Sequence, residues 1–412
     1  MVENSDGDTF LDCYHILDLT GEKGIYCTKL LADLGAEVTL VEPPAGHKSR
    51  HRGPFFHDDP HPEKSLNFLY FNTNKRSVTL DLEQADGQAI FKQLVKGADV
   101  VVEDFPVGYL KGLGLDYDSL SAINPKLVMA SITPFGQTGP WKDYKGSDLI
   151  AMAASGFMQI TGDPDKPPLR LGNEQSHYPP SQYASVGILA ALYHRDFVSG
   201  EGQYIDISML EGLIPYHLEQ HQAAMWRFMG QEPIRVGLHS YIAVPLGVYP
   251  CKDGWAVVLT PSDGDWDELA RWVVEETGEK AILDEELRGL LGDGRRARRD
   301  EVIAYIMGLS TTKTKYDFFH EGQRRDLGIE PVNTPEDLLD DPHLAASDFW
   351  IELEHPVVGN LKYPRRGPFF GDDCPELRKA APQLGEDNES VYCDELRYSK
   401  EDMILLRSRG VI

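Results

Sequence analysis

The chain has 412 residues, of which 41% are apolar and 26% charged, enough to build one large hydrophobic core or two of medium size. Its 66 acidic and 40 basic residues give a net charge of −26, which argues against binding to nucleic acid or to an anionic membrane. No apolar run reaches the roughly 20 residues of a membrane helix, and the five scattered cysteines match neither a disulfide framework nor a metal site. We therefore expect a globular protein of the reducing cytoplasm.

The first third of the chain alternates strand and helix patterns. Apolar alternation and Val-rich runs predict strands over 13–19, 37–42, 77–82, 99–104 and 127–133. Apolar residues at helical spacing predict helices over 25–36 and 87–98 between them. This alternation is typical of a parallel sheet covered by helices on both faces, so the predicted fold class is α/β with a Rossmann-like large domain.

The amino-acid composition of the chain changes after Gly146. Small apolar residues predict helices over 147–158 and 183–195, with a Pro-rich loop over 162–180 between them. Further elements are expected as a strand pair over 247–261 that turns at 252–254, acidic amphipathic helices over roughly 265–322, a strand over 349–355 and a charged final helix. These elements favour a second domain followed by a return to the first.

The sequence lacks the common nucleotide-binding motifs, which narrows the range of possible enzyme classes. The chain has neither GxGxxG after its first strand nor GxxxxGK[ST], so a dinucleotide or ATP enzyme is disfavoured. Two basic clusters contrast with the acidic background, namely Lys48–Arg52 with Arg50 and His51, and Asn74, Lys75 and Arg76 ahead of a predicted strand. Such clusters hold a phosphate-bearing ligand or neutralise nearby carboxylates, and the sequence leaves both interpretations open.

Several stretches taken together resemble the family III CoA-transferases, and the similarity runs over nearly the whole chain. The stretches are 28–44, 71–82, 98–105, 113–140, 187–212, 334–344 and 381–386. The resemblance implies an interlocked dimer, with a large domain from 1–215 and 331–412 and a smaller α+β domain, 216–330, inserted in it. It also implies an enzyme that takes a coenzyme A thioester as substrate, together with a carboxylic acid, and holds no permanent cofactor or metal.

The position of the family nucleophile is altered in this chain. Active members carry an aspartate ten residues before the glycine that corresponds to Gly187, and here that residue is His177. An imidazole can be acylated but offers no carbonyl carbon for a CoA thioester, so the usual cycle cannot pass through it. Glu174 is the nearest carboxylate, three residues earlier. His177 and Glu174 are therefore the candidate catalytic residues.

The expected grip on coenzyme A is also altered. We predict CoA contacts at seven positions of this chain: Asn74, Lys75, Arg76, Asp104, Phe105, Lys111 and Lys145. Asp104 stands where the family has a neutral asparagine. The arginine that the family has shortly afterwards is replaced in this chain, around Lys111. A carboxylate beside a polyphosphate costs on the order of 1 kcal/mol when partly exposed. Cofactor binding is therefore expected to be weaker than in active relatives.

Three functions remain open from the sequence. The first is the partner chain of a heteromeric CoA-transferase, in which a homologous second subunit supplies the aspartate. The chain is similar in this respect to the nucleophile-lacking subunit of heteromeric succinyl-CoA:benzylsuccinate CoA-transferases, enzymes of anaerobic aromatic degradation. The second is a self-sufficient transferase that uses Glu174 or His177, and the third is a non-enzymatic CoA-binding regulator. We favour the first, because the motifs that build the fold remain while those that touch the chemistry have changed.

Overall fold

The structure, a computed structural model, describes residues 9–217, 225–240, 243–289, 293–365 and 377–412. The chain divides into two compact units. The first comprises 1–156, 172–220 and 344–412, and the second comprises 157–171 and 221–343. Among the residues described, no helix is both long and apolar enough to cross a membrane.

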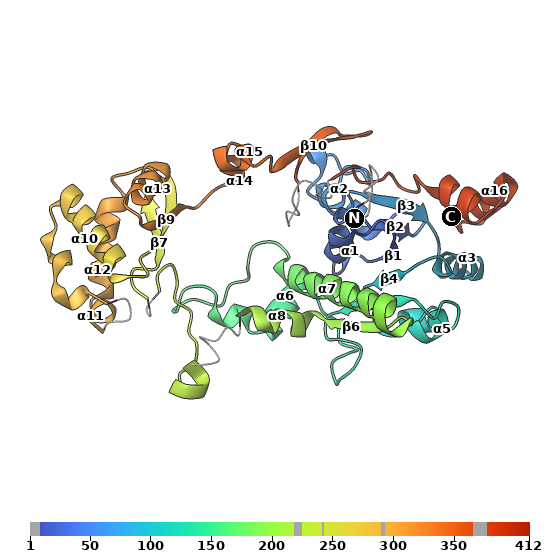
Figure 1. The fold of residues 1–412 in the computed structure, drawn as a ribbon, viewed down its shortest axis with the longest axis horizontal. Helices are drawn as coiled ribbons and strands as arrows, with labels where there is room; N and C mark the ends of the chain where they lie inside the picture. Colours follow the sequence, from blue (N-terminus) through green and yellow to red (C-terminus); the bar gives the residue numbers. More distant parts are fainter. Residues whose placement is uncertain (1–8, 218–224, 241–242, 290–292, 366–376) are drawn as a thin grey trace. The chain divides into compact units, whose positions relative to one another are not determined.

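A six-stranded parallel sheet forms the centre of the first unit (Figure 1). Its strands are β1 (His15–Leu19), β2 (Glu37–Glu42), β3 (Lys75–Thr79), β4 (Val100–Glu103), β5 (Val128–Thr133) and β6 (Tyr204–Ser208). The order is β3-β2-β1-β4-β5-β6, so the chain reverses its direction across the sheet between β1 and β4. This confirms the predicted α/β class and its parallel sheet, and β6 adds a strand that the sequence analysis did not predict.

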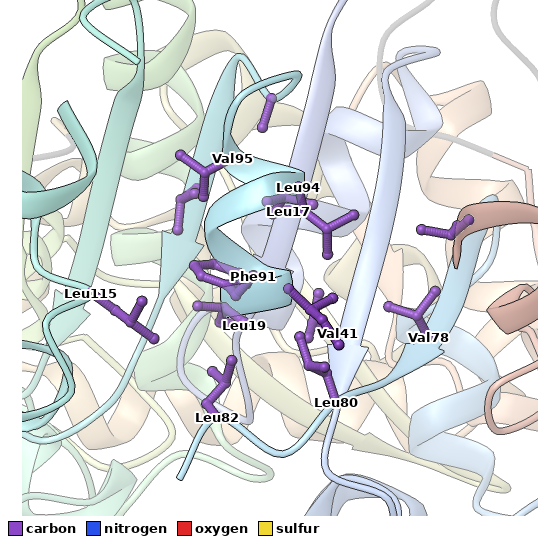
Figure 2. Close-up of a cluster of buried hydrophobic side chains, with 14 of the residues drawn as sticks. Leu17, Leu19, Val41, Val78, Leu80, Leu82, Phe91, Leu94, Val95 and Leu115 are labelled. Atoms are coloured by element: carbon purple, nitrogen blue, oxygen red, sulfur yellow. The ribbon is translucent and has the colours of Figure 1, made fainter. Parts of the chain in front are cut away.

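Helices of the first unit pack on both faces of this sheet. They are α1 (Ile25–Asp33), α2 (Leu66–Phe71), α3 (Ala85–Val95), α4 (Tyr109–Gly112), α5 (Tyr117–Ser121), α6 (Asp148–Ala154), α7 (Tyr178–His194), α8 (Met209–His217) and α16 (Lys400–Ser408). Figure 2 shows Phe91 of α3 set among Leu17 and Leu19 of β1. Phe91 is fully buried, which stabilises this contact by roughly 3 kcal/mol. Elsewhere α1 packs against α7, which also contacts β5 and β6.

The Pro-rich stretch ahead of α7 is shorter than predicted. The loop was expected to run to residue 180, yet α7 begins at Tyr178 and contains both Pro179 and Pro180. Proline is tolerated in the first turn of a helix, because the backbone N–H groups there have no helical acceptor. Composition alone therefore placed the start of this helix too late, and the true start brings it next to His177.

The C-terminal segment returns to the edge of the same sheet. The Tyr392 hydroxyl donates to the Thr79 carbonyl (2.8 Å), and the Asp387 amide donates to the Ser77 carbonyl (2.9 Å). Tyr392 is fully buried and belongs to the same hydrophobic cluster as Phe91. A hairpin of β10 (Trp350–His355) and β11 (Gly359–Pro364) precedes it along the chain and confirms the strand predicted at 349–355.

The second unit has its own sheet and core. The antiparallel strands β7 (Gly247–Cys251), β8 (Gly254–Leu259) and β9 (Gly328–Pro331) pair in that order, which confirms the predicted hairpin. Its helices are α10 (Asp263–Thr277), α11 (Asp293–Ala297), α12 (Arg299–Ser310), α13 (Lys315–Arg324) and α14 (Pro335–Leu339), followed along the chain by α15 (Pro342–Ala346). Trp266 and Trp272 of α10 are buried at the centre of this core.

Candidate active site

The candidate site lies at the carboxyl ends of β1 and β4, where the strand order reverses. Parallel α/β sheets bind ligands outside this switch point, because the loops after the two strands diverge there and leave a crevice. The loop from Thr20 to Gly24 follows β1, and Asp104 follows β4. The hydrogen bonds between these two segments are therefore the first indication of what the site can hold.

Asp104 occupies the N-terminus of α1. Its Oδ2 accepts hydrogen bonds from the amides of Lys23 (3.0 Å) and Gly24 (3.1 Å), and the Lys23 ammonium lies 3.7 Å from Oδ1. The amides at a helix N-terminus attract anions, including phosphate groups. Here a carboxylate of the chain itself takes that position. A ligand phosphate at the same amides would have to displace Asp104.

His177 lies at the end of a short helical turn, Gln175–His177, immediately before α7. The residue is only 8% exposed, and burial lowers the pKa of its imidazole below the usual 6.5. The charges of Glu174 and Asp148 oppose this shift without reversing it. The ring is therefore neutral at pH 7. Glu174 Oε2 lies 3.7 Å from His177 Nδ1, so the structure brings the two predicted catalytic residues together.

Arg52 links Glu174 to the loop after β1. Its Nη1 donates to Glu174 Oε2 at 2.7 Å, and its Nη2 donates to the other oxygen of the same carboxylate. Arg52 Nη1 also lies 2.8 Å from Glu22 Oε1. The hydrogen bonds that Arg52 donates to Glu174 raise the pKa of Arg52, so this side chain is a permanent cation between two carboxylates.

Asp148, the first residue of α6, supports the turn that carries His177. Its Oδ1 accepts a hydrogen bond from the Ser176 amide at 3.0 Å. Asp148 is 7% exposed and Ser176 is fully buried. Asp148 Oδ2 and the Ser176 hydroxyl have no hydrogen-bond partner among the described residues. Buried polar atoms without partners are rare, and they often lie at ligand sites.

The two basic clusters mainly neutralise carboxylates. The fully buried Lys75 donates to Asp18 Oδ2, Thr28 Oγ1 and Asn72 Oδ1, each at 2.9 Å. Arg50 is equally buried, and its Nε donates to Glu42 Oε2 at 2.6 Å. All three ammonium hydrogens of Lys75 are thus engaged, which is what a residue that stabilises the sheet requires.

Asn74 and Arg76 lie at the amino end of β3, away from the carboxyl ends that form the crevice. Asn74 has a left-handed backbone (φ 63°), and its side-chain oxygen accepts from the amides of residues 378 and 379. Arg76 pairs with Glu37 and with Glu395. The structure does not group these two residues with His177, and their contacts join the C-terminal segment to the sheet.

One of the remaining predicted CoA contacts, Lys111, lies at a cavity of about 420 Å³ next to β4 and β5. Lys111 lines this cavity with Glu103, whereas the exposed Lys145 lies in the segment before α6. Phe105 packs on Tyr109, with ring centroids 4.7 Å apart. Burial raises the pKa of Glu103 to about 7. Contacts of these residues with CoA stay a prediction.

No group of side chains with metal-ligand character occurs in the part of the chain that the structure describes. The chemistry available in the candidate site is that of an imidazole, a guanidinium and several carboxylates. Such a set can bind and orient an organic acid and can exchange protons with it.

Comparison with known proteins decides the family. Residues 13–388 match the description of CoA-transferase family III. The chain belongs to this family. It is 33% identical to the succinyl-CoA:(R)-benzylsuccinate CoA-transferase subunit BbsE of Thauera aromatica, over 92% of this chain and 93% of that protein. It is 34% identical to the succinate–glutarate CoA-transferase of Agrobacterium fabrum, over 90% and 92% of the two chains.

A solved structure shares the fold as well. The CAIB/BAIF family protein from Brucella suis superposes with a TM-score of 0.83 at 29% identity, over 94% of this chain and 99% of that one. As a family III CoA-transferase, the chain is an enzyme that uses a CoA thioester as a substrate. The resemblance found in the sequence is therefore confirmed.

Sequence reasoning missed three residues of the site. Arg52 was seen only as one member of a basic cluster, and Glu22 and Asp148 were not singled out. The available signal for Arg52 was its membership of a basic cluster in an acidic chain, but its partner Glu174 is 122 residues away. Nothing in the local pattern separates Arg52 from the fully buried Arg50.

Proposed function

We propose that this chain is one subunit of a heteromeric CoA-transferase and that a homologous second subunit supplies the catalytic aspartate. The enzyme moves CoA from a donor such as succinyl-CoA to a carboxylic acid, with an arylsuccinate such as benzylsuccinate as the acceptor. The observation that carries the proposal is the buried His177 at the position where the family resemblance implies the aspartate of active members.

The chemistry of transfer explains why this residue matters. A carboxylate attacks the acyl-CoA thioester, giving a mixed anhydride and releasing the CoA thiolate. The thiolate then attacks the carbonyl carbon of the protein carboxyl group, which frees the donor acid and leaves CoA on the protein as a thioester. His177 has no carbonyl carbon to receive the thiolate. A cycle at the family position therefore requires a partner chain that carries an aspartate.

The relatives support both the donor and the subunit role. The Thauera aromatica protein is named as a subunit of a transferase that uses succinyl-CoA. A Chloroflexus aurantiacus relative, 30% identical over 94% of this chain, is named as the alpha subunit of a succinyl-CoA–L-malate CoA-transferase. Succinyl-CoA is also the donor named for the D-citramalate enzyme of that organism, which is 31% identical over 98% of this chain.

An exposed apolar surface supports a partner chain. Along α7 and the turn after it, Val186, Tyr193, Phe197 and Val198 are each 64–73% exposed. Several exposed apolar side chains on one stretch of the chain are typical of a protein–protein interface. A second chain packed on α7 would remove them from water, as in the interlocked dimer that the resemblance implies.

The test is a CoA-exchange assay with labelled succinate and succinyl-CoA. The purified chain is assayed alone and after co-expression with a homologous chain from the same organism that carries the aspartate. We expect no exchange from the chain alone and full exchange from the mixture. Exchange by the chain alone would contradict the proposal.

A second candidate is a self-sufficient transferase with Glu174 as its nucleophile. It is favoured by the 3.7 Å distance between Glu174 and His177, which places a carboxylate beside the family position. It is disfavoured because Arg52 binds both oxygens of that carboxylate and so reduces its nucleophilicity. Loss of exchange by the isolated chain after Glu174→Gln is the result that would support this candidate.

A further inference from the structure

The contact between Arg52 and Glu174 has the form that proteins use to bind an organic acid. Two nitrogens of one guanidinium face two oxygens of one carboxylate, and the Nη1–Oε2 distance is 2.7 Å. This two-point geometry makes arginine selective for planar carboxylates. The side chain of Glu174 thus shows how an acid of similar shape would lie on Arg52.

Arg52 is held in place by its backbone while its side chain stays accessible. The buried Ser65 hydroxyl donates to the Arg52 carbonyl at 2.6 Å, which fixes this end of the turn. The Arg52 and Glu174 side chains are 38% and 33% exposed, whereas Arg50 two residues away is completely buried. Breaking a solvent-exposed ion pair requires little free energy, so a ligand from solution can compete for Arg52.

The surroundings of this pair match a substrate site better than a purely structural bridge. Glu174 lies 3.7 Å from His177, and the same turn carries the buried Ser176, whose hydroxyl has no hydrogen-bond partner within the described part of the chain. Glu174 itself comes from the segment before this turn, not from a long helix or strand. A shift of that short segment would uncover Arg52 and leave the sheet intact.

We propose that Arg52 binds the carboxylate of an acid substrate and that Glu174 occupies this position until the acid displaces it. The acid replaces one carboxylate by another, so the guanidinium is paired with a carboxylate both before and after binding. Glu22 remains on Nη1 and keeps Arg52 oriented during the exchange. The proposal rests on the proposed function only for the class of ligand, a dicarboxylic acid such as succinate.

The experiment is a calorimetric titration of the purified chain with succinate. Glu174→Gln removes the competing charge, so succinate should bind about fivefold more tightly, the ratio expected for the loss of one partly exposed ion pair. Arg52→Gln should weaken succinate binding at least tenfold. The affinity of Arg52→Lys should lie between those of Arg52→Gln and the unchanged chain, because lysine keeps the positive charge but loses the two-point contact with a carboxylate. Thermal unfolding confirms that each variant is folded.

Glu354→Gln is the matched control, because Glu354 is exposed on β10 and the substitution changes the net charge by the same amount. It should leave succinate affinity unchanged. Succinate binding that is unaltered or weaker in Glu174→Gln, or unaltered in Arg52→Gln, would overturn the proposal. The absence of CoA exchange in the two-chain mixture would instead refute the proposed function, and it would leave these titrations as they are.

Discussion

Arg50 offers the sharpest test of how the large unit is held together. Its Nη2 donates to Glu42 Oε1 (2.8 Å) and to the Pro382 carbonyl (3.0 Å), and its Nη1 donates to Glu63 Oε2 (2.9 Å). Arg50 and Glu42 are both completely buried. One guanidinium thus joins β2, the turn after it and the C-terminal segment.

Arg50→Met keeps most of the side-chain volume but removes every one of these donors. Among the described residues, Glu42 then retains the Ser77 hydroxyl (2.7 Å) and the His47 amide (3.1 Å) as donors and has no counter-charge. Breaking a buried ion pair in this way costs about 3–5 kcal/mol. For a unit of this size the cost corresponds to a fall in Tm on the order of 10 °C.

Differential scanning calorimetry measures the effect. Arg409→Met is the control, since its pair with Asp86 has both side chains 55% exposed, and it should shift Tm by no more than about 2 °C. Glu42→Gln combined with Arg50→Met should recover part of the loss, because no unpaired buried charge remains. Equal shifts for Arg50→Met and Arg409→Met would refute the reasoning.

Three further predictions follow from the structure. Burial raises the pKa of Glu103 to about 7, so protonation of this carboxyl group stabilises the fold at low pH, and the contribution is lost as the pH rises from the ordinary pKa through 7. The free energy of unfolding of Glu103→Gln, relative to that of the unchanged chain, should therefore increase by up to ~3 kcal/mol between pH 5 and 8, as measured by unfolding titrations. By NMR, His177 should titrate below pH 6.5, and Glu174→Gln should lower its pKa further, since that carboxylate is the largest charge opposing the effect of burial. A Cβ at Gly202 would lie 1.9 Å from the Leu127 carbonyl oxygen, so Gly202→Ala should cost about 1–3 kcal/mol, whereas Gly112→Ala, which meets open space, should not.

The sequence predicted β1 to β5 because these strands are largely buried and rich in apolar residues, whereas the partly exposed β6 was missed. β2 was predicted at 37–42, its observed bounds, and β4 and β5 within one residue at each end. β3 was predicted at 77–82 but occupies Lys75–Thr79. A lysine is usually exposed, so the predicted strand begins after it. Lys75 is buried in the strand because it pairs with residues distant in the sequence, among them Asp18 and Thr28.

The site was less accessible to sequence reasoning. Counting back from the helix glycine found His177, and the nearest carboxylate, Glu174, does lie beside it. The burial and ion pairing of the basic residues could not be predicted from the sequence. Arg50 is fully buried, whereas Arg52, only two residues later, is partly exposed. Their roles depend on carboxylates that the fold brings in from other segments.

Direct trapping of the covalent intermediate tests the central claim. The two-chain enzyme is incubated with succinyl-CoA and treated with borohydride or hydroxylamine, and the modified peptide is located by mass spectrometry. We predict that the modification falls on an aspartate of the partner chain and that no carboxylate of this chain is labelled. A modified Glu174 would contradict the account.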